Sequence, residues 1–376
     1  MREEHPREGE PPAGAHRPGE MRHGDAPADG PRGGEVPMDG PRSGAALTGK
    51  TPTGGDDAPK ALSPSRYLAW LYSTEARKPV LATLLNIESE IASGLRPGLE
   101  HHVAHARLQW WSEEAERVAE GRPVHPLTRE LVKARSNASG NAGNPSGAHA
   151  DRVASAAAGL TAHDAGLTAH IAGFVDTAIW DLASATFETR KELTAYCERW
   201  ATAMFETADG LTRAEARDLA TDAAPATVEK PAAGASAPSP WTVLGAAVRE
   251  IELLADAARD VQLGRVRIPL DELDRASVDA NALVKLPWPA PLAALIKARH
   301  EALRATIAKG VAALTREEQM AQRGLLVWVA LMWRLSTRAE RALPNVILPR
   351  RYDALADGWQ AWRAARRAAA GKLRLD

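Results

Sequence analysis

The sequence predicts an all-α protein, and two observations lead to that prediction. Leucine and alanine recur at spacings of three and four residues through most of residues 61–376, which is the period of an amphipathic helix. Short alternating runs of apolar and polar residues, the usual signal of strands, are nearly absent. The chain has 376 residues and is 44% hydrophobic, so it can bury a large core.

Composition divides the chain into a tail and one helical domain. Gly, Pro, Arg and Glu dominate residues 1–60, with near-repeats such as "GPRGGEVPMDGPRSG". Such a segment cannot bury enough apolar surface to offset its chain entropy, so we expect a disordered tail. We expect the domain at 61–376 to be interrupted by flexible segments at 135–152 and 217–240, which are rich in small and polar residues or in Pro and Ala.

Several helix boundaries follow from capping residues. Ser63 and Pro64 are placed as an N-cap and a first helical residue. The helix containing "HARLQWWSEEAERVAEG" is expected to end at Gly121, and Thr189 with Glu192 forms a capping pair. Later helices are expected at about 290–314, at 316–340 and from Tyr352 onward.

Charge and cysteine content limit the possible partners. Against 48 acidic residues stand 47 Lys and Arg, so no overall field attracts nucleic acid, and any anion site must be local. The single cysteine, Cys197, is expected to be a buried small hydrophobe in a reducing compartment. The run "GLLVWVALMW" has about half the ~20 residues that cross a bilayer. We therefore expect a cytoplasmic protein with no transmembrane span, and leave peripheral membrane contact open.

One acidic pair carries the main chemical hypothesis. Asp256 and Asp260, four residues apart, lie on one helical face, where both carboxylates could reach Mg²⁺ bound to a diphosphate. Acid pairs are also common on solvated helix faces, which is the alternative. Arg249, Arg259 and Arg265 could neutralise a diphosphate or serve as ion-pair partners within the helix.

Other candidate sites are weaker. His101 and His102 each share a helical face with His105, but no fourth zinc ligand follows at a suitable spacing, which favours surface histidines. Trp110 and Trp111 point in different directions around a helix, so one ring is expected in the core and the other at a cavity or partner surface. The absence of GxGxxG, Walker and GxSxG motifs gives no support to nucleotide-dependent or serine-hydrolase functions.

Several stretches, in the same order between about 65 and 370, resemble the squalene/phytoene synthase family. The segment "RLQWWSEEAERVAEGRPVHP" resembles the family's W…G…HP segment and is the most specific match. "DLASATFETRKELTAYCERWA" resembles another family segment. "DAARDVQLGRVRIPLDEL" resembles the second aspartate-rich motif, in which Gly-Arg-Val-Tyr-Leu-Pro follows D-x-x-x-D; here Arg267 replaces the tyrosine.

The resemblance implies an isoprenoid-synthase-like helical bundle with a central cavity. It also implies a Mg²⁺-dependent prenyltransferase that joins two prenyl diphosphates, farnesyl or geranylgeranyl diphosphate, head to head. By position, Asp256 and Asp260 match the catalytic metal ligands of the second motif. The residues expected to bind the substrate diphosphate are Arg249, Arg259, Arg265 and Arg77.

The first aspartate-rich motif of the family has no counterpart here. Positions 92–96 read "ASGLR", without a carboxylate. Glu88 and Glu90 lie just before, but residues two apart point to different faces of a helix, and Glu90 is the one expected to face the cavity as a further metal ligand. Loss of preorganised charge typically costs on the order of 3 kcal/mol per group in the transition state.

The same departure resembles a branch of the family, the assembly factors for respiratory complex I. In that branch the corresponding segment runs E-I-A into R-L-Q-W-W, much as residues 90–92 and 107–111 do here. Two functions therefore remain open. One is a Mg²⁺-dependent prenyltransferase, and the other is a non-catalytic assembly factor or binding protein with a protein partner in respiratory complex assembly.

Overall fold

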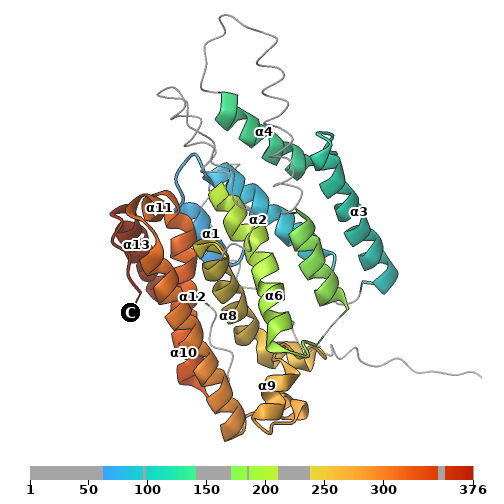
Figure 1. Ribbon diagram of the computed structural model, residues 1–376, viewed down its shortest axis with the longest axis vertical. Coiled ribbons are helices and arrows are strands. Elements are labelled where there is room, and N and C mark those ends of the chain that lie inside the picture. The colour runs from blue at the N-terminus through green and yellow to red at the C-terminus, as the bar shows by residue number, and fades with distance from the viewer. Residues whose placement is uncertain are drawn as a thin grey trace, which may run out of the picture. The chain divides into compact units, whose positions relative to one another are not determined.

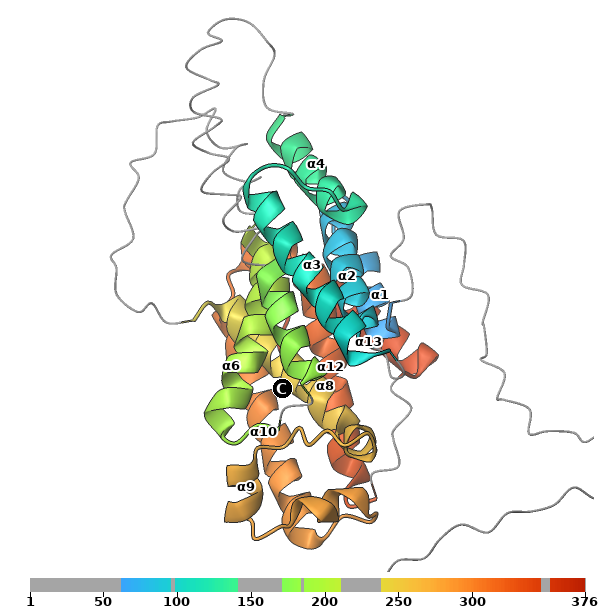
Figure 2. The same ribbon diagram turned by 90° about the vertical axis from the view of Figure 1, so that its right-hand side faces the viewer.

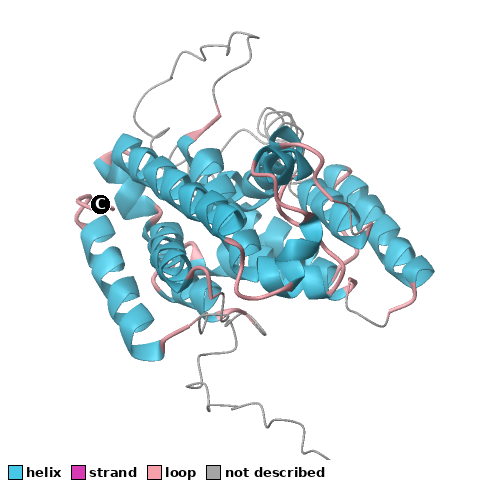
Figure 3. Cartoon of the chain, turned by 90° about the horizontal axis from the view of Figure 1, so that it is seen from below, coloured by secondary structure: helices cyan, strands magenta, loops and turns pink. Residues whose placement is uncertain are grey.

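Helices make up all the regular secondary structure in the part of the chain that the structure describes (Figure 1). The structure is a computed structural model that describes residues 62–95, 99–140, 171–183, 186–210, 238–345 and 352–375. Within these ranges there is no strand, as the colouring by secondary structure in Figure 3 makes plain. The all-α prediction is confirmed, whereas the predicted tail lies outside the described residues.

The helices fall in sequence regions with the expected period. Residues 171–182 are also helical. The remaining elements are α1 (Pro64–Leu71), α2 (Lys78–Ser93), α3 (His101–Ala119), α4 (Pro126–Gly140), α6 (Arg190–Ala201), a π-helical turn η1 (Thr202–Glu206), α8 (Pro240–Gln262), α9 (Leu270–Arg275), a 3₁₀ turn η2 (Ala280–Val284), α10 (Ala290–Ala313), α11 (Arg316–Ala321), α12 (Arg323–Ala342) and α13 (Ala354–Ala369).

Helix α8 lies at the centre of the packing. It contacts α6, η1, α10 and α12, and Figure 2 shows α6, α8, α10 and α12 grouped together. Leu244, Val248 and Ile251 of α8 are fully buried, so the helix is apolar over most of its surface. Trp200 and Trp328 pack edge to face beside it, with ring centroids 5.7 Å apart. The polar face of α8 is therefore narrow, and it is the face on which the acidic pair lies.

Helix starts agree with the predicted caps. Ser63 and Pro64 occupy the N-cap and first position of α1, and the Thr189 hydroxyl accepts a hydrogen bond from the Glu192 backbone N–H at 3.4 Å. Helix α3 stops just before Gly121, whose positive φ of 70° turns the chain.

Two of the predicted boundaries were wrong. The helix expected at 316–340 is broken at Gln322 into α11 and α12. Helix α12 then begins directly against α1, because a Cβ at Gly324, in its first turn, would lie 2.5 Å from the Ala69 carbonyl oxygen. The loop expected from residue 135 is helical as far as Gly140, and the rest of it lies outside the described residues.

None of the described helices combines the length and the apolar character that crossing a bilayer requires. The run "GLLVWVALMW" lies in α12, where Leu326, Val327 and Trp328 have no exposed surface. Its hydrophobicity is therefore explained by burial in the core.

A buried histidine makes the stability of this fold sensitive to pH. His300 of α10 is 1% exposed, and its Nδ1 lies 3.0 Å from the Ser336 hydroxyl of α12. Burial and the nearby Arg304 guanidinium, only partly opposed by Glu340, lower the pKa of His300 to about 4. Because this folded-state pKa lies below the unfolded value of about 6.5, His300 favours folding above pH 6.5, and this contribution falls away as pH drops toward 4.

We predict that the free energy of unfolding falls by about 2 kcal/mol between pH 7 and pH 5 through His300 alone. Urea unfolding of the wild type and of His300→Gln at both pH values measures this. The glutamine variant keeps a polar side chain but does not titrate, so its loss between the two pH values should be smaller by that amount. Equal losses would contradict the assignment.

Candidate functional site

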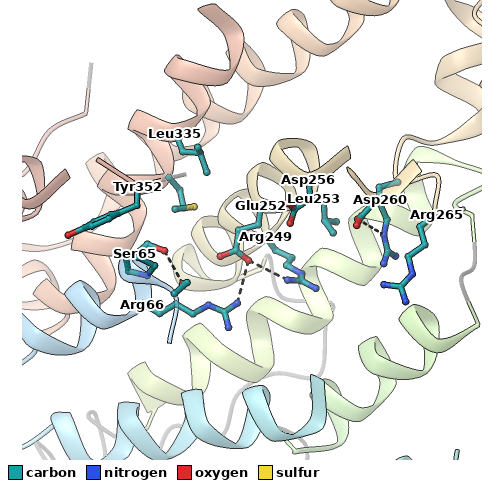
Figure 4. Close-up of a pocket in the computed structure, with 14 residues that line it drawn as sticks. Ser65, Arg66, Arg249, Glu252, Leu253, Asp256, Asp260, Arg265, Leu335 and Tyr352 are labelled. Atoms are coloured by element: carbon teal, nitrogen blue, oxygen red, sulfur yellow. Dashed lines mark hydrogen bonds and ion pairs between the residues drawn. The ribbon is translucent and has the colours of Figure 1, made fainter. Parts of the chain in front are cut away.

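A pocket of about 290 Å³ opens between α1, α8 and α12 (Figure 4). We call it the α8 pocket. Its charged lining consists of four arginines and three carboxylates, and its apolar lining includes Leu253, Met332 and Leu335. The charged residues are Arg66, Arg249, Arg265, Arg267, Glu252, Asp256 and Asp260. The pocket therefore combines a slightly cationic polar side with an apolar wall.

Helix α8 supplies most of this polar side. Arg249, Glu252, Asp256 and Asp260 follow one another at spacings of three, four and four residues, which places them on one face. All four line the α8 pocket, and Figure 4 shows them in succession along the helix. The acidic pair thus faces a cavity and is not part of a fully solvated surface.

The end of α8 positions a further arginine. Gly264 has a positive φ of 76°, a conformation that glycine adopts without strain. The turn is closed by two backbone hydrogen bonds, from Gly264 N–H to the Val261 carbonyl at 2.9 Å and from Arg265 N–H to the Asp260 carbonyl at 2.8 Å. The chain therefore folds back immediately, and Arg265 joins the lining beside Asp260. This turn is the structural reason for the Gly-Arg sequence.

An ion-pair chain begins at α1 and α2. Arg66 forms ion pairs with Glu88 and, at 3.5 Å, with Glu252. Glu88 also accepts a hydrogen bond from the Trp200 indole N–H at 3.0 Å, and Arg249 lies 3.3 Å from Glu252. Burial would lower the pKa of Arg66, but the carboxylates of Glu88 and Glu252 outweigh it and raise that pKa. Arg66 of α1 is therefore held as a cation between α2, which carries Glu88, and α8, which carries Glu252.

The ion-pair chain continues to the acidic pair. Arg249 donates to the Tyr196 hydroxyl at 2.7 Å and lies 3.7 Å from Asp181. Arg267, only 4% exposed, bridges Asp181 at 2.8 Å and Asp260 at 3.3 Å. Burial raises the pKa of Tyr196, so its hydroxyl keeps its proton. The arginine at the position where the resembled motif has tyrosine thus neutralises one of the two aspartates.

Most, but not all, of the predicted site residues meet in the α8 pocket. Those that line it are Asp256, Asp260, Arg249 and Arg265. Arg259 is exposed and does not line the pocket, because it lies on a different face of α8. Arg77 donates a hydrogen bond to the Ala321 carbonyl at the end of α11 and is also absent from the lining. We therefore omit Arg259 and Arg77 from the site.

The expected orientation of the two glutamates is reversed. Glu88 is 9% exposed and points inward, whereas Glu90 is exposed. Glu90 lines a second cavity of about 290 Å³, which we call the His125 pocket, and its Oε1 lies 3.1 Å from the Nε2 of His125. Glu90 is therefore not a companion of Asp256 and Asp260. The other residues lining the His125 pocket are Ile91, Ser93, Gly94, Arg107, Leu108, Trp110 and Trp111.

The W…G…HP segment forms a structural corner beside the His125 pocket. Glu114 of α3 has no exposed surface and accepts hydrogen bonds from the backbone N–H groups of Val124 and His125, at 2.9 and 2.8 Å. The Thr128 hydroxyl and the Arg117 guanidinium also donate to it, at 2.5 and 2.8 Å. Burial would raise the pKa of Glu114, but these four donors outweigh it and lower that pKa.

His125 itself caps α4. Its Nδ1 accepts a hydrogen bond from the Leu127 backbone N–H at 3.2 Å, so its Nε2 carries the proton and donates to Glu90. Both ring nitrogens are thus satisfied by protein groups. The histidine and the following proline of the motif are accounted for as a helix start, without reference to a ligand.

The weaker sequence candidates behave as expected. His101, His102 and His105 are exposed, and no group of three or more potential metal-binding side chains occurs among the described residues. Cys197 is 1% exposed, and burial raises its pKa well above the usual range. Trp111 is buried at 5%, whereas Trp110 is 36% exposed, as their different directions predicted.

The acidic pair fits a single Mg²⁺ ion. This ion is commonly held by one or two carboxylates, with waters and substrate phosphates completing its shell, and Asp256 and Asp260 supply two on one wall. Four arginines line the same pocket and carry the positive charge that an anion beside the metal would need: Arg66, Arg249, Arg265 and Arg267. A bound Mg²⁺ would supply Lewis-acid neutralisation of a diphosphate.

Sequence reasoning missed three polar groups of the site: Arg66, Glu252 and Asp181. Glu252 could have been found, because it precedes Asp256 by one helical turn. Arg66 and Asp181 lie far from α8 in sequence, and no spacing rule connects them to it.

Comparisons with known proteins agree with this fold. The squalene/phytoene synthase family profile matches residues 60–359, most of the chain, so the protein belongs to the squalene/phytoene synthase family. A dehydrosqualene synthase crystallised with a ligand superposes with a TM-score of 0.59 at 15% identity, covering 81% of this chain and 91% of that one.

A second solved structure, squalene synthase HpnC from Alicyclobacillus acidocaldarius, gives a TM-score of 0.52 at 13% identity, over 73% of this chain and 87% of that one. At such identities the likeness shows the helical isoprenoid-synthase fold. No curated protein sequence matches significantly.

We predict that Glu114→Gln lowers the free energy of unfolding by about 2 kcal/mol at pH 7, because four donors lose a charged acceptor. The depressed pKa also means that the wild type keeps this contribution above the unfolded pKa and loses it as pH falls through the folded pKa. Urea unfolding at pH 7 and at pH 3 measures both effects. The control is Glu113→Gln, whose side chain is 49% exposed; an equal loss in the control would contradict the role of Glu114.

Proposed function

We propose that this protein binds a prenyl diphosphate in the α8 pocket, with Mg²⁺ at Asp256 and Asp260, and transfers the prenyl group poorly or not at all. The observation that carries the proposal is the shared lining: both aspartates, Arg265 and an apolar wall face one cavity. A diphosphate needs cations and hydrogen-bond donors, and its hydrocarbon chain needs an apolar surface. The α8 pocket offers both.

The guanidinium groups supply the contacts to the anion. Arg265 lines the pocket beside Asp260, and its side chain makes no ion pair with any described residue. Arg249 and Arg267 also line the pocket, where each is paired with a carboxylate. Arginine is suited to this role because its planar fork matches the spacing of phosphate oxygens.

Weak transfer follows from how few other acids the described lining contains. Glu88, the inward carboxylate on α2, does not line the pocket and is engaged by Arg66 and Trp200. Asp260 is partly neutralised by Arg267. The carboxylates that could hold metal ions against the charge of a departing diphosphate are therefore few. Binding needs fewer preorganised groups than ionisation, so binding is retained more readily than turnover.

We predict that farnesyl or geranylgeranyl diphosphate binds in the presence of Mg²⁺, and that Asp256→Ala with Asp260→Ala weakens this binding at least about tenfold. Titration calorimetry with and without Mg²⁺ measures it. The control is Asp274→Ala, which removes an exposed aspartate outside the pocket. Pyrophosphate release should be at least about a hundredfold slower than for a catalytic family member assayed in parallel.

Three results would contradict this proposal. They are the absence of binding by the wild type, undiminished binding after removal of both aspartates, and turnover at the rate of the catalytic member. The last result would instead support an active prenyltransferase with an unconventional first acidic site.

A second candidate function is a non-catalytic assembly factor, with a protein partner in respiratory complex assembly. The observation that favours it is the pairing of Arg66, Arg249 and Arg267 with Glu252 and Asp260 inside the pocket, which stabilises the fold without any ligand. On this hypothesis the pocket binds no substrate, and the outer surface of the helical domain binds the protein partner.

Genetic complementation separates the two candidates. If the protein acts only in assembly, a deletion strain carrying Asp256→Ala and Asp260→Ala should assemble respiratory complex I as well as one carrying the wild type, as native gels would show. Loss of complex I in that strain, with normal levels of the variant protein, would contradict a function independent of the pocket.

A further inference from the structure

Helix α13 carries a stripe of large apolar side chains on its outer side. Leu355, Trp359 and Trp362 are spaced by four and three residues, so they lie on one face, and they are 87%, 57% and 39% exposed. The two indole rings are stacked, with centroids 4.8 Å apart and planes 23° apart. Arg366, a further turn along the same face, places its guanidinium 5.1 Å from the Trp362 ring centroid.

The fold does not need these aromatic rings. The inner face of α13 is made of alanines, which are buried where the helix packs on α12 and α11. These are Ala361, Ala364, Ala365 and Ala368. An amphipathic helix normally places its largest apolar residues inward. Here the arrangement is inverted, since small residues pack against the core and two tryptophans face outward, so the outer stripe calls for another explanation.

The exposed charges on α13 itself are all positive, and the nearest exposed acid in the described sequence is Asp353, the N-cap of the helix. Arg363, Arg366 and Arg367 are exposed on α13, and Lys372 and Arg374 follow it. The only acid within α13, Asp357, is 3% exposed and is neutralised by Arg334 at 2.7 Å and Arg338 at 3.7 Å. The outer side of α13 is therefore apolar, aromatic and cationic.

We propose that α13 docks this protein on an anionic lipid surface, with Trp359 and Trp362 in the headgroup region and the three arginines against lipid phosphates. Tryptophan favours this region because its ring is apolar and its N–H is polar, and basic residues are attracted to the negative surface potential. This charge complementarity is what selects an anionic bilayer as the occupant.

Docking would also bring the α8 pocket to a lipid surface. Tyr352, two residues before α13, lines that pocket together with Leu335 of α12, as Figure 4 shows. An apolar ligand dissolved in a bilayer would then have a short route to the pocket. The docking proposal itself does not depend on this, because it rests on the residues of α13 alone.

Vesicle sedimentation with the full chain tests the proposal. The wild type should pellet with phosphatidylcholine vesicles that contain phosphatidylglycerol, and not with phosphatidylcholine alone. Trp359→Ser with Trp362→Ser should weaken binding at least about tenfold, and raised salt should weaken it as well. A second variant, Arg363→Gln with Arg366→Gln and Arg367→Gln, should also lose about tenfold or more.

Matched controls remove the same residue types elsewhere. Trp110→Ser removes an exposed tryptophan of α3, and Arg122→Gln with Arg275→Gln removes exposed arginines, whose side chains are 75% and 66% exposed. The controls should bind vesicles like the wild type. Thermal melting of every variant should match the wild type closely, since none of these side chains is buried.

The proposal would be overturned if the wild type failed to bind anionic vesicles or if the α13 variants bound them normally. It would equally be overturned if the stripe proved to be a contact between two copies, seen as a dimer in solution that the tryptophan variant dissociates while vesicle binding is unaffected. Prenyl diphosphate binding without vesicles should be unchanged in the α13 variants, so failure here is distinct from failure of the proposed function.

Discussion

The ion-pair chain along α8 is the interaction on which the rest of the structure depends. It links Arg66 of α1 to Glu88 of α2 and Glu252 of α8, and it ends where Arg267 meets Asp260. A buried charge that loses its partner costs several kcal/mol, so none of these elements can shift alone. Apolar packing brings the helices together, but these charges fix their rotation around α8.

The same interaction limits what the pocket can do. In this arrangement the protein's own arginines and carboxylates satisfy one another, and a ligand must compete with those contacts. On the proposed function, the pair of aspartates and Arg265 at the end of α8 would hold a diphosphate, whereas driving its departure would need more preorganised charge. The family's helical scaffold is thus retained, and Asp256 and Asp260 face one pocket in it.

Local features could be predicted from the sequence, and features set between helices could not. Caps, helix ends and the shared face of Asp256 and Asp260 depend on residues a few positions apart. The spacing within α2 could have corrected the expectation for Glu88 and Glu90. Glu88 lies one helical turn from both Leu84 and Ile91, on the buried face of α2, whereas Glu90 lies off that face. The partners of Arg66 come from separate helices, so only the folded structure reveals them.

Gly324 gives the pocket a dependence on a residue that does not line it. Helix α12 can begin against the Ala69 carbonyl only because this position has no side chain. A heavier residue would push α1 outward, and Arg66, one turn earlier on that helix, would move away from Glu252. The charge pattern of α8 is therefore coupled, through the backbone of α1, to the absence of a side chain at position 324.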